Sequence, residues 1–340
     1  MTDALPLARY RFTARFADDL LLPPYAGFLL RGVFGAALRR TVCMTGLDRC
    51  GECPLQRTCA YPALFEVPPQ PTQFAQQFSQ LPNPYVIEPP PPTTAPQVLP
   101  AGEPLVWHMV LIGEATLDRL ALIVRAWERA LRQGLGPQRV PGELLAVERV
   151  DEAGDLTLAE PATTEVTLHF HTPLRLQHQG QPLGPDRLDA RTLLSQTLRR
   201  TNLVLDLHLG IRPAPFDAST LLAAVAPTLS DDRRDLCWHD WPRYSGRQKQ
   251  EMNLGGVMGA WTLRADAAAL APFLPWLRLG QWLHLGKNAT MGLGGYRLVR
   301  IPADMTAPRR DLMDVLTALD RSERLALDTD TDTDLLDNLP

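Results

Sequence analysis

The chain has 340 residues, 45% of them hydrophobic and 21% charged, which is typical of one or two globular domains. Its formal net charge is −4, but residues 305–340 hold four arginines and nine acids, so the rest is nearly neutral. Charge alone therefore neither indicates nor excludes a nucleic-acid partner. No run of eighteen apolar residues predicts a membrane span, and the N-terminus lacks a secretory signal pattern. We expect a cytoplasmic protein with no membrane partner.

The first half of the chain has an alternating order of strand and helix patterns. Residues 8–17 alternate apolar and polar side chains, as a half-buried strand does, and residues 23–40 have apolar positions at helical spacing. The segment 82–104 is crowded with prolines, so PYVIE within it can pair only at a sheet edge. A strand over 103–113, an amphipathic helix over 116–134 and a strand over 142–150 follow.

The second half repeats the plan. We predict strands at 164–177, 255–265 and 296–301 and helices at 189–210 and 265–280, whereas the pattern of the stretch around DLCWHDWPRYS is uncertain. The fold class is α+β, with tandem ferredoxin-like (RRM-like, βαββαβ) domains and a glycine-rich loop before the final strand. The predicted parts are an N-terminal domain (1–150) with a cysteine insertion at 43–59, a C-terminal domain (151–304) with the loop at 286–295, and a short helix with a disordered acidic tail (305–340).

Four of the five cysteines lie close together. Cys43, Cys50, Cys53 and Cys59 have the spacing Cys-x6-Cys-x2-Cys-x5-Cys. Four thiolates could complete a tetrahedral zinc shell, and an iron–sulfur cluster also uses four thiolates. The alternatives are reduced thiols or two disulfides. With no open ligand position, a metal here would stabilise the loop and would do no chemistry. Cys237 stands apart, and we expect it to be buried.

The most glycine-rich stretch is LGQWLHLGKNATMGLGGYRL, residues 279–298. A P-loop requires Gly-x4-Gly-Lys-Ser/Thr, and here the spacing is wrong and Asn288 replaces the hydroxyl residue. A dinucleotide fingerprint opens a helix, whereas this stretch leads into a strand. Two hypotheses remain: a plain turn, or a loop whose backbone amides follow the phosphates of a polymer.

Several stretches resemble the precursor-RNA-processing endoribonuclease branch of the RAMP (repeat-associated) superfamily of CRISPR systems. They are PPYAGFLLRGVFGAALRR with the cysteines and CAYPALFE (23–66), TPLRLQHQG (172–180), RYSGRQKQEMNLGGVMGAW (243–261) and LRLGQWLHLGKNATMGLGGYRL (277–298). The resemblance runs through most of the chain up to about residue 301 and does not cover the proline-rich segment or the acidic tail.

The resemblance implies a metal-independent endoribonuclease that binds CRISPR repeat RNA and cuts precursor transcripts to guide RNAs. In such enzymes the 2′-hydroxyl attacks the neighbouring phosphate, leaving 2′,3′-cyclic phosphate and 5′-hydroxyl ends. Catalysis would need no cofactor, and zinc would be structural. Repeat RNA is the implied partner, and other CRISPR effector subunits are candidate partners.

The site residues are less well defined, because many family members have a catalytic histidine in or before the first helix and this chain has none before His108. Tyr25 is available there instead. We predict His284, Lys287 and Tyr25 as catalytic residues, with a turn-holding role as the alternative for His284. The predicted RNA-binding residues are Arg31, Arg243, Tyr244, Ser245, Arg247, Lys249, Gly286, Asn288, Gly292, Gly294 and Arg297.

Two other functions remain open. The missing early histidine also suits a RAMP subunit that binds guide RNA without cutting it. The cysteines and the acidic tail suit a metal-stapled interaction protein that does not bind RNA.

Overall fold

The computed structural model describes residues 5–68, 81–152, 163–210, 218–245 and 250–299. The helix and acidic tail predicted beyond residue 305 lie outside them. Residues 1–299 form one compact unit. Among the described residues, no helix combines the length and apolar character that a membrane span needs.

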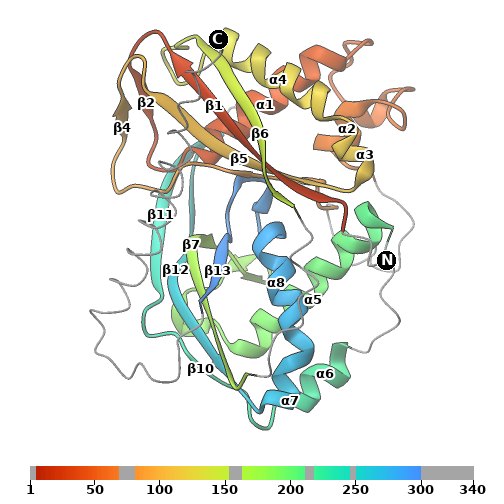
Figure 1. Ribbon diagram of the computed structural model, residues 1–340, viewed down its shortest axis with the longest axis vertical. Helices are drawn as coiled ribbons and strands as arrows, with labels where there is room; N and C mark the ends of the chain where they lie inside the picture. The colour runs from red at the N-terminus through yellow and green to blue at the C-terminus, as the bar shows by residue number, and fades with distance from the viewer. Residues whose placement is uncertain (1–4, 69–80, 153–162, 211–217, 246–249, 300–340) are drawn as a thin grey trace, which may run out of the picture. The chain divides into compact units, whose positions relative to one another are not determined.

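The first half folds as a four-stranded antiparallel sheet with two helices on one face (Figure 1). The strands are β1 (Leu7–Phe16), β3 (Tyr85–Glu88), β5 (Pro104–Ile112) and β6 (Gly142–Glu152), in the order β3-β5-β1-β6. The main helices are α1 (Gly27–Val42) and α4 (Leu120–Gln133), and the smaller elements are β2 (Leu20–Leu22), β4 (Gln97–Leu99), α2 (Ala60–Phe65) and α3 (Glu114–Leu117).

The alternation along β1 explains this arrangement. Phe12, Ala14 and Phe16 are fully buried beneath the helices, whereas Arg11 points to the other face and pairs with Glu148 of β6. Side chains on a strand alternate between its two faces, so one face joins the core and the other meets solvent.

The second half has the same strand order around β7 (Glu165–Leu174). Its other strands are β10 (Ser230–Asp232), β11 (Cys237–Ser245), β12 (Gln250–Arg264) and β13 (Tyr296–Val299), with the path β10-β12-β7-β13 and β11 paired to β12. The helices are α5 (Ala190–Val204), α6 (Ala218–Val225), α7 (Ala267–Leu270) and α8 (Leu274–Leu283), and a short hairpin joins β8 (Gln177–His178) to β9 (Gln181–Pro182). Both sheets have the ferredoxin-like order, which confirms the predicted tandem fold.

The structure resolves one uncertain stretch and corrects two local predictions. The uncertain stretch around DLCWHDWPRYS is strand β11, which exists because β12 pairs with it along its length. The predicted helix 265–280 is interrupted by a 3₁₀ turn, Ala271–Phe273, that contains a proline. Cys237 is exposed, because it lies on β11 outside the core. The predicted domain limits stay a prediction.

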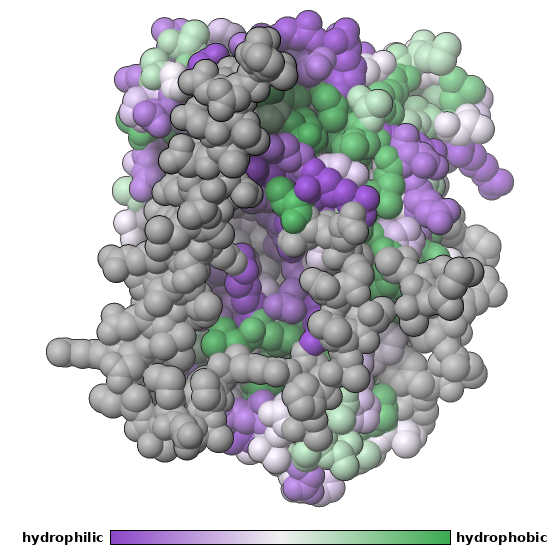
Figure 2. Space-filling model, in the orientation of Figure 1, coloured by the Kyte–Doolittle hydropathy of each residue, from purple (hydrophilic) through white to green (hydrophobic). Residues whose placement is uncertain are grey.

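Apolar side chains join the first sheet to the helices of the second half. Val86 and Val110 of the first sheet cluster with Val204 of α5 and with Leu279 and Leu283 of α8. Hydrophilic residues cover much of the described surface in the view of Figure 2. Among the described residues, the most exposed large hydrophobic side chain is that of Met44, at 87%, in the cysteine segment.

Candidate nucleic-acid interface

The glycine-rich loop joins α8 to β13 and is fastened to the end of β7. The Lys287 amide donates to the Arg175 carbonyl oxygen at 2.9 Å, and the Gly294 amide donates to the Pro173 carbonyl oxygen at 2.8 Å. The Gly295 amide donates to Oγ1 of Thr172 at 2.7 Å. These amides donate hydrogen bonds within the protein, so the loop is a turn fixed to the end of β7. The three amides are therefore not free to donate to the phosphates of a ligand.

Two glycines make this close approach possible. Gly286 and Gly294 have φ values of 77° and 72°, in the left-handed region that favours glycine. A Cβ atom at Gly294 would overlap the Leu285 carbonyl oxygen, and one at Gly286 would lie 2.5 Å from the Arg175 carbonyl oxygen. The sequence therefore needs glycine here for backbone packing as well as for any contact with a ligand.

We expect Gly294→Ala to destabilise the protein by about 2 kcal/mol or more. The positive φ at this position is strained for alanine, and the added Cβ would clash with the Leu285 carbonyl oxygen. Urea unfolding would measure the effect. Gly32→Ala in α1 is the matched control, since no atom lies within 4 Å of the added Cβ and alanine favours the helix. Equal stability of the two variants would contradict this role for Gly294.

A buried polar network lies beneath the loop. His284 is 1% exposed; its Nδ1 lies 3.1 Å from the Gly292 carbonyl oxygen and its Nε2 lies 3.3 Å from Oε1 of Glu88. Both partners accept hydrogen bonds, so a doubly protonated ring satisfies both and a neutral ring only one. His284 also has a φ of 54°, which costs a non-glycine residue roughly 1–3 kcal/mol. The ring therefore ties the loop to β3 of the first sheet.

Arg9 completes this network from β1. Its Nε donates to Oε2 of Glu88 at 2.9 Å, and its guanidinium carbon lies 4.4 Å from the centroid of the Trp282 ring. Burial acts to raise the pKa of Glu88, but Arg9 and His284 outweigh it and hold that pKa well below its usual range. Glu88 is thus a partly buried carboxylate that stays ionised and links β1 and β3 of the first sheet to the end of α8.

Glu88→Gln should destabilise the protein by about 2 kcal/mol at pH 7, because it removes the partly buried carboxylate that pairs with Arg9. Glu148→Gln is the control: its partner Arg11 is at the surface, and we expect a loss under about 1 kcal/mol. The depressed pKa means that the Glu88 contribution is complete above its unfolded pKa of about 4.3 and is lost as pH falls toward the folded value. Urea titrations at pH 7 and below pH 4 would measure the free energy of unfolding of Glu88→Gln and of wild type. The difference between them should be smaller below pH 4 than at pH 7. A difference that does not change with pH would refute this account.

Tyr25 reaches the loop from the start of α1. Its hydroxyl donates to the Met291 carbonyl oxygen at 2.7 Å, and its ring packs on Phe28 and Trp241. The side chain is 1% exposed, and burial raises its pKa well above the ordinary value. In this conformation Tyr25 fixes the loop, and its predicted catalytic role stays a prediction.

Ionisable side chains line the face of the second sheet opposite its helices. Leu168 and Phe170 of β7 point into the helix-covered core, so His169 and His171 lie on the other face. Arg297 of β13 is the register partner of His169 and is exposed. Although the His171 side chain reaches solvent, desolvation of its ring and the nearby His284 lower its pKa. Lys287 is exposed where β7 ends.

The other predicted RNA-binding residues lie elsewhere or outside the described residues. Arg31 in α1 has its guanidinium carbon 4.1 Å from the centroid of the Phe65 ring. Asn288 and Gly292 have positive φ values within the loop. Arg243, Tyr244 and Ser245 are on β11, but their side chains are outside the described part, as are Arg247 and Lys249 altogether. Their role in RNA binding stays a prediction.

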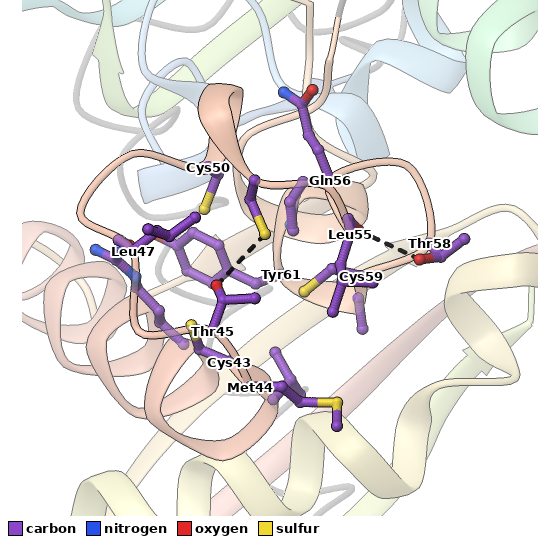
Figure 3. Close-up of a pocket in the computed structure, with 15 residues that line it drawn as sticks. Cys43, Met44, Thr45, Leu47, Cys50, Leu55, Gln56, Thr58, Cys59 and Tyr61 are labelled. Carbon is purple, nitrogen blue, oxygen red and sulfur yellow. Dashed lines mark hydrogen bonds between the residues drawn. The ribbon is translucent and has the colours of Figure 1, made fainter.

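The four clustered cysteines lie in the segment between α1 and α2 and line one pocket (Figure 3). In the described part of the chain, no three His, Cys, Asp or Glu side chains already have the arrangement of a metal site. Their predicted role as ligands stays a prediction.

Sequence reasoning missed Glu88 and Arg9. Glu88 was noticeable, because this charge comes directly after the apolar run Tyr-Val-Ile, whereas Arg9 stands at an ordinary polar position of the alternating strand β1. Their partnership could not be found from the sequence, since Glu88 and His284 are 196 positions apart.

Two family models match the chain. One, AF_1859_N, is described as an N-terminal domain and matches residues 5–171. The other is described as "CRISPR-associated endoribonuclease Cas6" and matches residues 168–296, which include the glycine-rich loop. No curated protein sequence matches the chain.

Solved structures share the fold. A Cas6 product complex has a TM-score of 0.54 at 17% identity, covering 87% of this chain and all of that one. Thermus thermophilus Cas6 has a TM-score of 0.52 at 16% identity, covering 86% of this chain and 98% of that one. A partial Cas6-RT-Cas1–Cas2 complex has a TM-score of 0.53 at 12% identity, covering 90% of this chain and 48% of that one. At these identities the likeness concerns the fold alone.

Proposed function

Since the chain belongs to the Cas6 family of CRISPR-associated endoribonucleases, we propose that it binds CRISPR repeat RNA and cuts precursor transcripts into guide RNAs. The observation that carries the proposal is the match over 168–296, because this segment contains both the pinned loop and the ionisable face of the second sheet. Exposed Lys287 and Arg297 supply positive charge there for a phosphate backbone.

The proposed reaction uses the RNA's own 2′-hydroxyl as the nucleophile. The O2′–P bond forms and the P–O5′ bond breaks, giving a 2′,3′-cyclic phosphate and a 5′-hydroxyl. A base takes the 2′-hydroxyl proton, a proton donor protonates the leaving O5′, and a cation stabilises the charge on the phosphorane. No water has to be activated as a nucleophile, which is why we propose a metal-independent reaction.

We assign direct contact with the RNA to Lys287 and His171. Lys287 is exposed on a loop that is fixed at both ends, so it can hold a phosphoryl oxygen without ordering the backbone first. His171 is exposed and its ring is neutral at pH 7, so it can accept a proton, although its lowered pKa makes it a weaker base than an ordinary histidine. His284 and Tyr25 are buried and act in this proposal as positioning residues, through Gly292 and Met291.

A second function is supported by one observation. None of the seven histidines precedes His108, so the start of α1 lacks the histidine that many relatives of this kind have. A chain without that group could bind guide RNA and leave it uncut. Other CRISPR effector subunits would then be its partners.

Incubation of the pure protein with its own repeat RNA in EDTA separates the two functions. The proposal predicts salt-sensitive binding and one discrete cut. Tight binding without a cut would support the RNA-binding subunit, and no salt-sensitive binding would refute both.

A further inference from the structure

The cysteine segment forms a pocket of about 300 Å³ beside the first sheet's helices. Cys43, Cys50, Cys53 and Cys59 all line it. Figure 3 shows the sulfurs of Cys43, Cys50 and Cys59 and the hydroxyl of Thr45 directed toward the same space. The fifth cysteine, on β11, does not line this pocket, so four of the five thiols are gathered in one place.

Two of the cysteines lie at helix ends and two lie in the segment between them. Cys43 is the residue that ends α1 and Cys59 is the residue that begins α2, and the two helices pack so closely that a Cβ at Gly35 would strike the Phe65 ring. Cys50 and Cys53 flank one 3₁₀ turn, closed by the Cys53 amide donating to the Cys50 carbonyl oxygen at 3.1 Å. Two thiols therefore lie on helix ends and two on a Cys-x2-Cys turn, as in knuckles that bind metal.

Polar groups already contact two of the sulfurs. The Gly46 amide donates to Sγ of Cys43 at 3.4 Å, in a turn where Gly46 has a φ of 69°. Oγ1 of Thr45 lies 3.4 Å from Sγ of Cys53. Donors of this kind orient thiolate ligands and stabilise their charge when a metal is bound.

The segment is held by Arg39, which donates to the Leu47 and Asp48 carbonyl oxygens, and by Cys50 and Cys59, which pack against the first core, but it adds little buried surface of its own. Its 3₁₀ turn contains no buried residue, and Met44 and Leu47 are exposed. A short stretch without a core of its own is commonly stabilised by disulfides or by a structural metal. All four thiols are free in the structure, and a set of four soft thiolates selects zinc over magnesium or calcium.

We propose that Cys43, Cys50, Cys53 and Cys59 bind one structural zinc ion that fastens the α1–α2 connection. This goes beyond the proposed RNA cleavage and does not depend on it. In the present arrangement the sulfurs do not yet form a completed shell. Binding draws them inward to Zn–S distances of about 2.3 Å, and the exposed residues between the helix ends supply the movement.

Metal analysis of the purified protein tests the proposal. We expect one zinc per chain in wild type and in the control Cys237→Ser, and less than a tenth of that in Cys50→Ser/Cys53→Ser. A strong chelator should lower the melting temperature of wild type by several degrees and leave that of the double variant unchanged. Unchanged zinc in the double variant, iron with acid-labile sulfide, or four cysteines recovered as two disulfides would each overturn the proposal.

Cobalt substitution keeps the test valid if the double variant does not fold. Cobalt(II) added to zinc-depleted wild type should give the visible bands of a tetrahedral thiolate site, and zinc should abolish them. Cobalt bands that are absent, or that persist in the presence of excess zinc, would refute the site.

Discussion

Lys287→Ala should slow single-turnover cleavage of repeat RNA by about 10²- to 10³-fold, because it removes the cation that we place on the phosphorane. The side chain is exposed while its own amide is fixed to the Arg175 carbonyl oxygen, so the variant should fold normally. Repeat affinity should fall far less than the cleavage rate, since one phosphate contact is a small part of binding. The slope of log affinity against log salt should decrease by about one.

Lys287→Arg is the matched control for charge. It keeps the cation and should retain most of the cleavage rate. If Lys287→Ala cleaves within a few-fold of wild type under saturating protein, this residue does not contact the reacting phosphate.

His171→Ala should slow the same reaction by about 10²- to 10⁴-fold, the usual contribution of a proton-transfer group. His178→Ala is the control, because it removes an exposed histidine from the short hairpin strand β8, outside the loop contacts. Near-wild-type cleavage by His171→Ala would show that the base lies elsewhere.

The lowered pKa of His171 predicts how the cleavage rate depends on pH. A base with an ordinary histidine pKa would lose activity as pH falls through about 6.5, because protonation removes its lone pair. Since surrounding atoms hold the His171 pKa lower, the cleavage rate should stay level through that range and fall only at more acidic pH. His284→Ala differs in kind: it should lower stability and cleavage together, because it removes the contact between the loop and Glu88.

The fold could be predicted from the sequence because it depends on local patterns. The alternation in β1, the prolines beside β3 and the Gly210 stop of the long helical segment, where φ is 65°, each correspond to an element in the structure. Strand β11 could not be predicted, because its pairing with β12 decides its conformation. Local propensity carries no information about that partner.

The candidate site could be predicted only in part. The glycine-rich loop was identified, but the sequence could not show that several of its amides are bonded to residues 172–175 at the end of β7. Nor could it distinguish His284, which is buried with its Nε2 3.3 Å from Oε1 of Glu88, from His171, which reaches solvent. Both differences arise from contacts between residues that are far apart in the chain.

The most direct test of the central claim compares two repeat RNAs in EDTA, one all-ribose and one with a single 2′-deoxynucleotide on the 5′ side of the mapped cut. We predict one cut in the first, with 2′,3′-cyclic phosphate and 5′-hydroxyl ends detected by mass spectrometry, and no cut in the second. Cleavage of the deoxy-substituted RNA at the same bond, or no cleavage of the all-ribose repeat, would contradict the account.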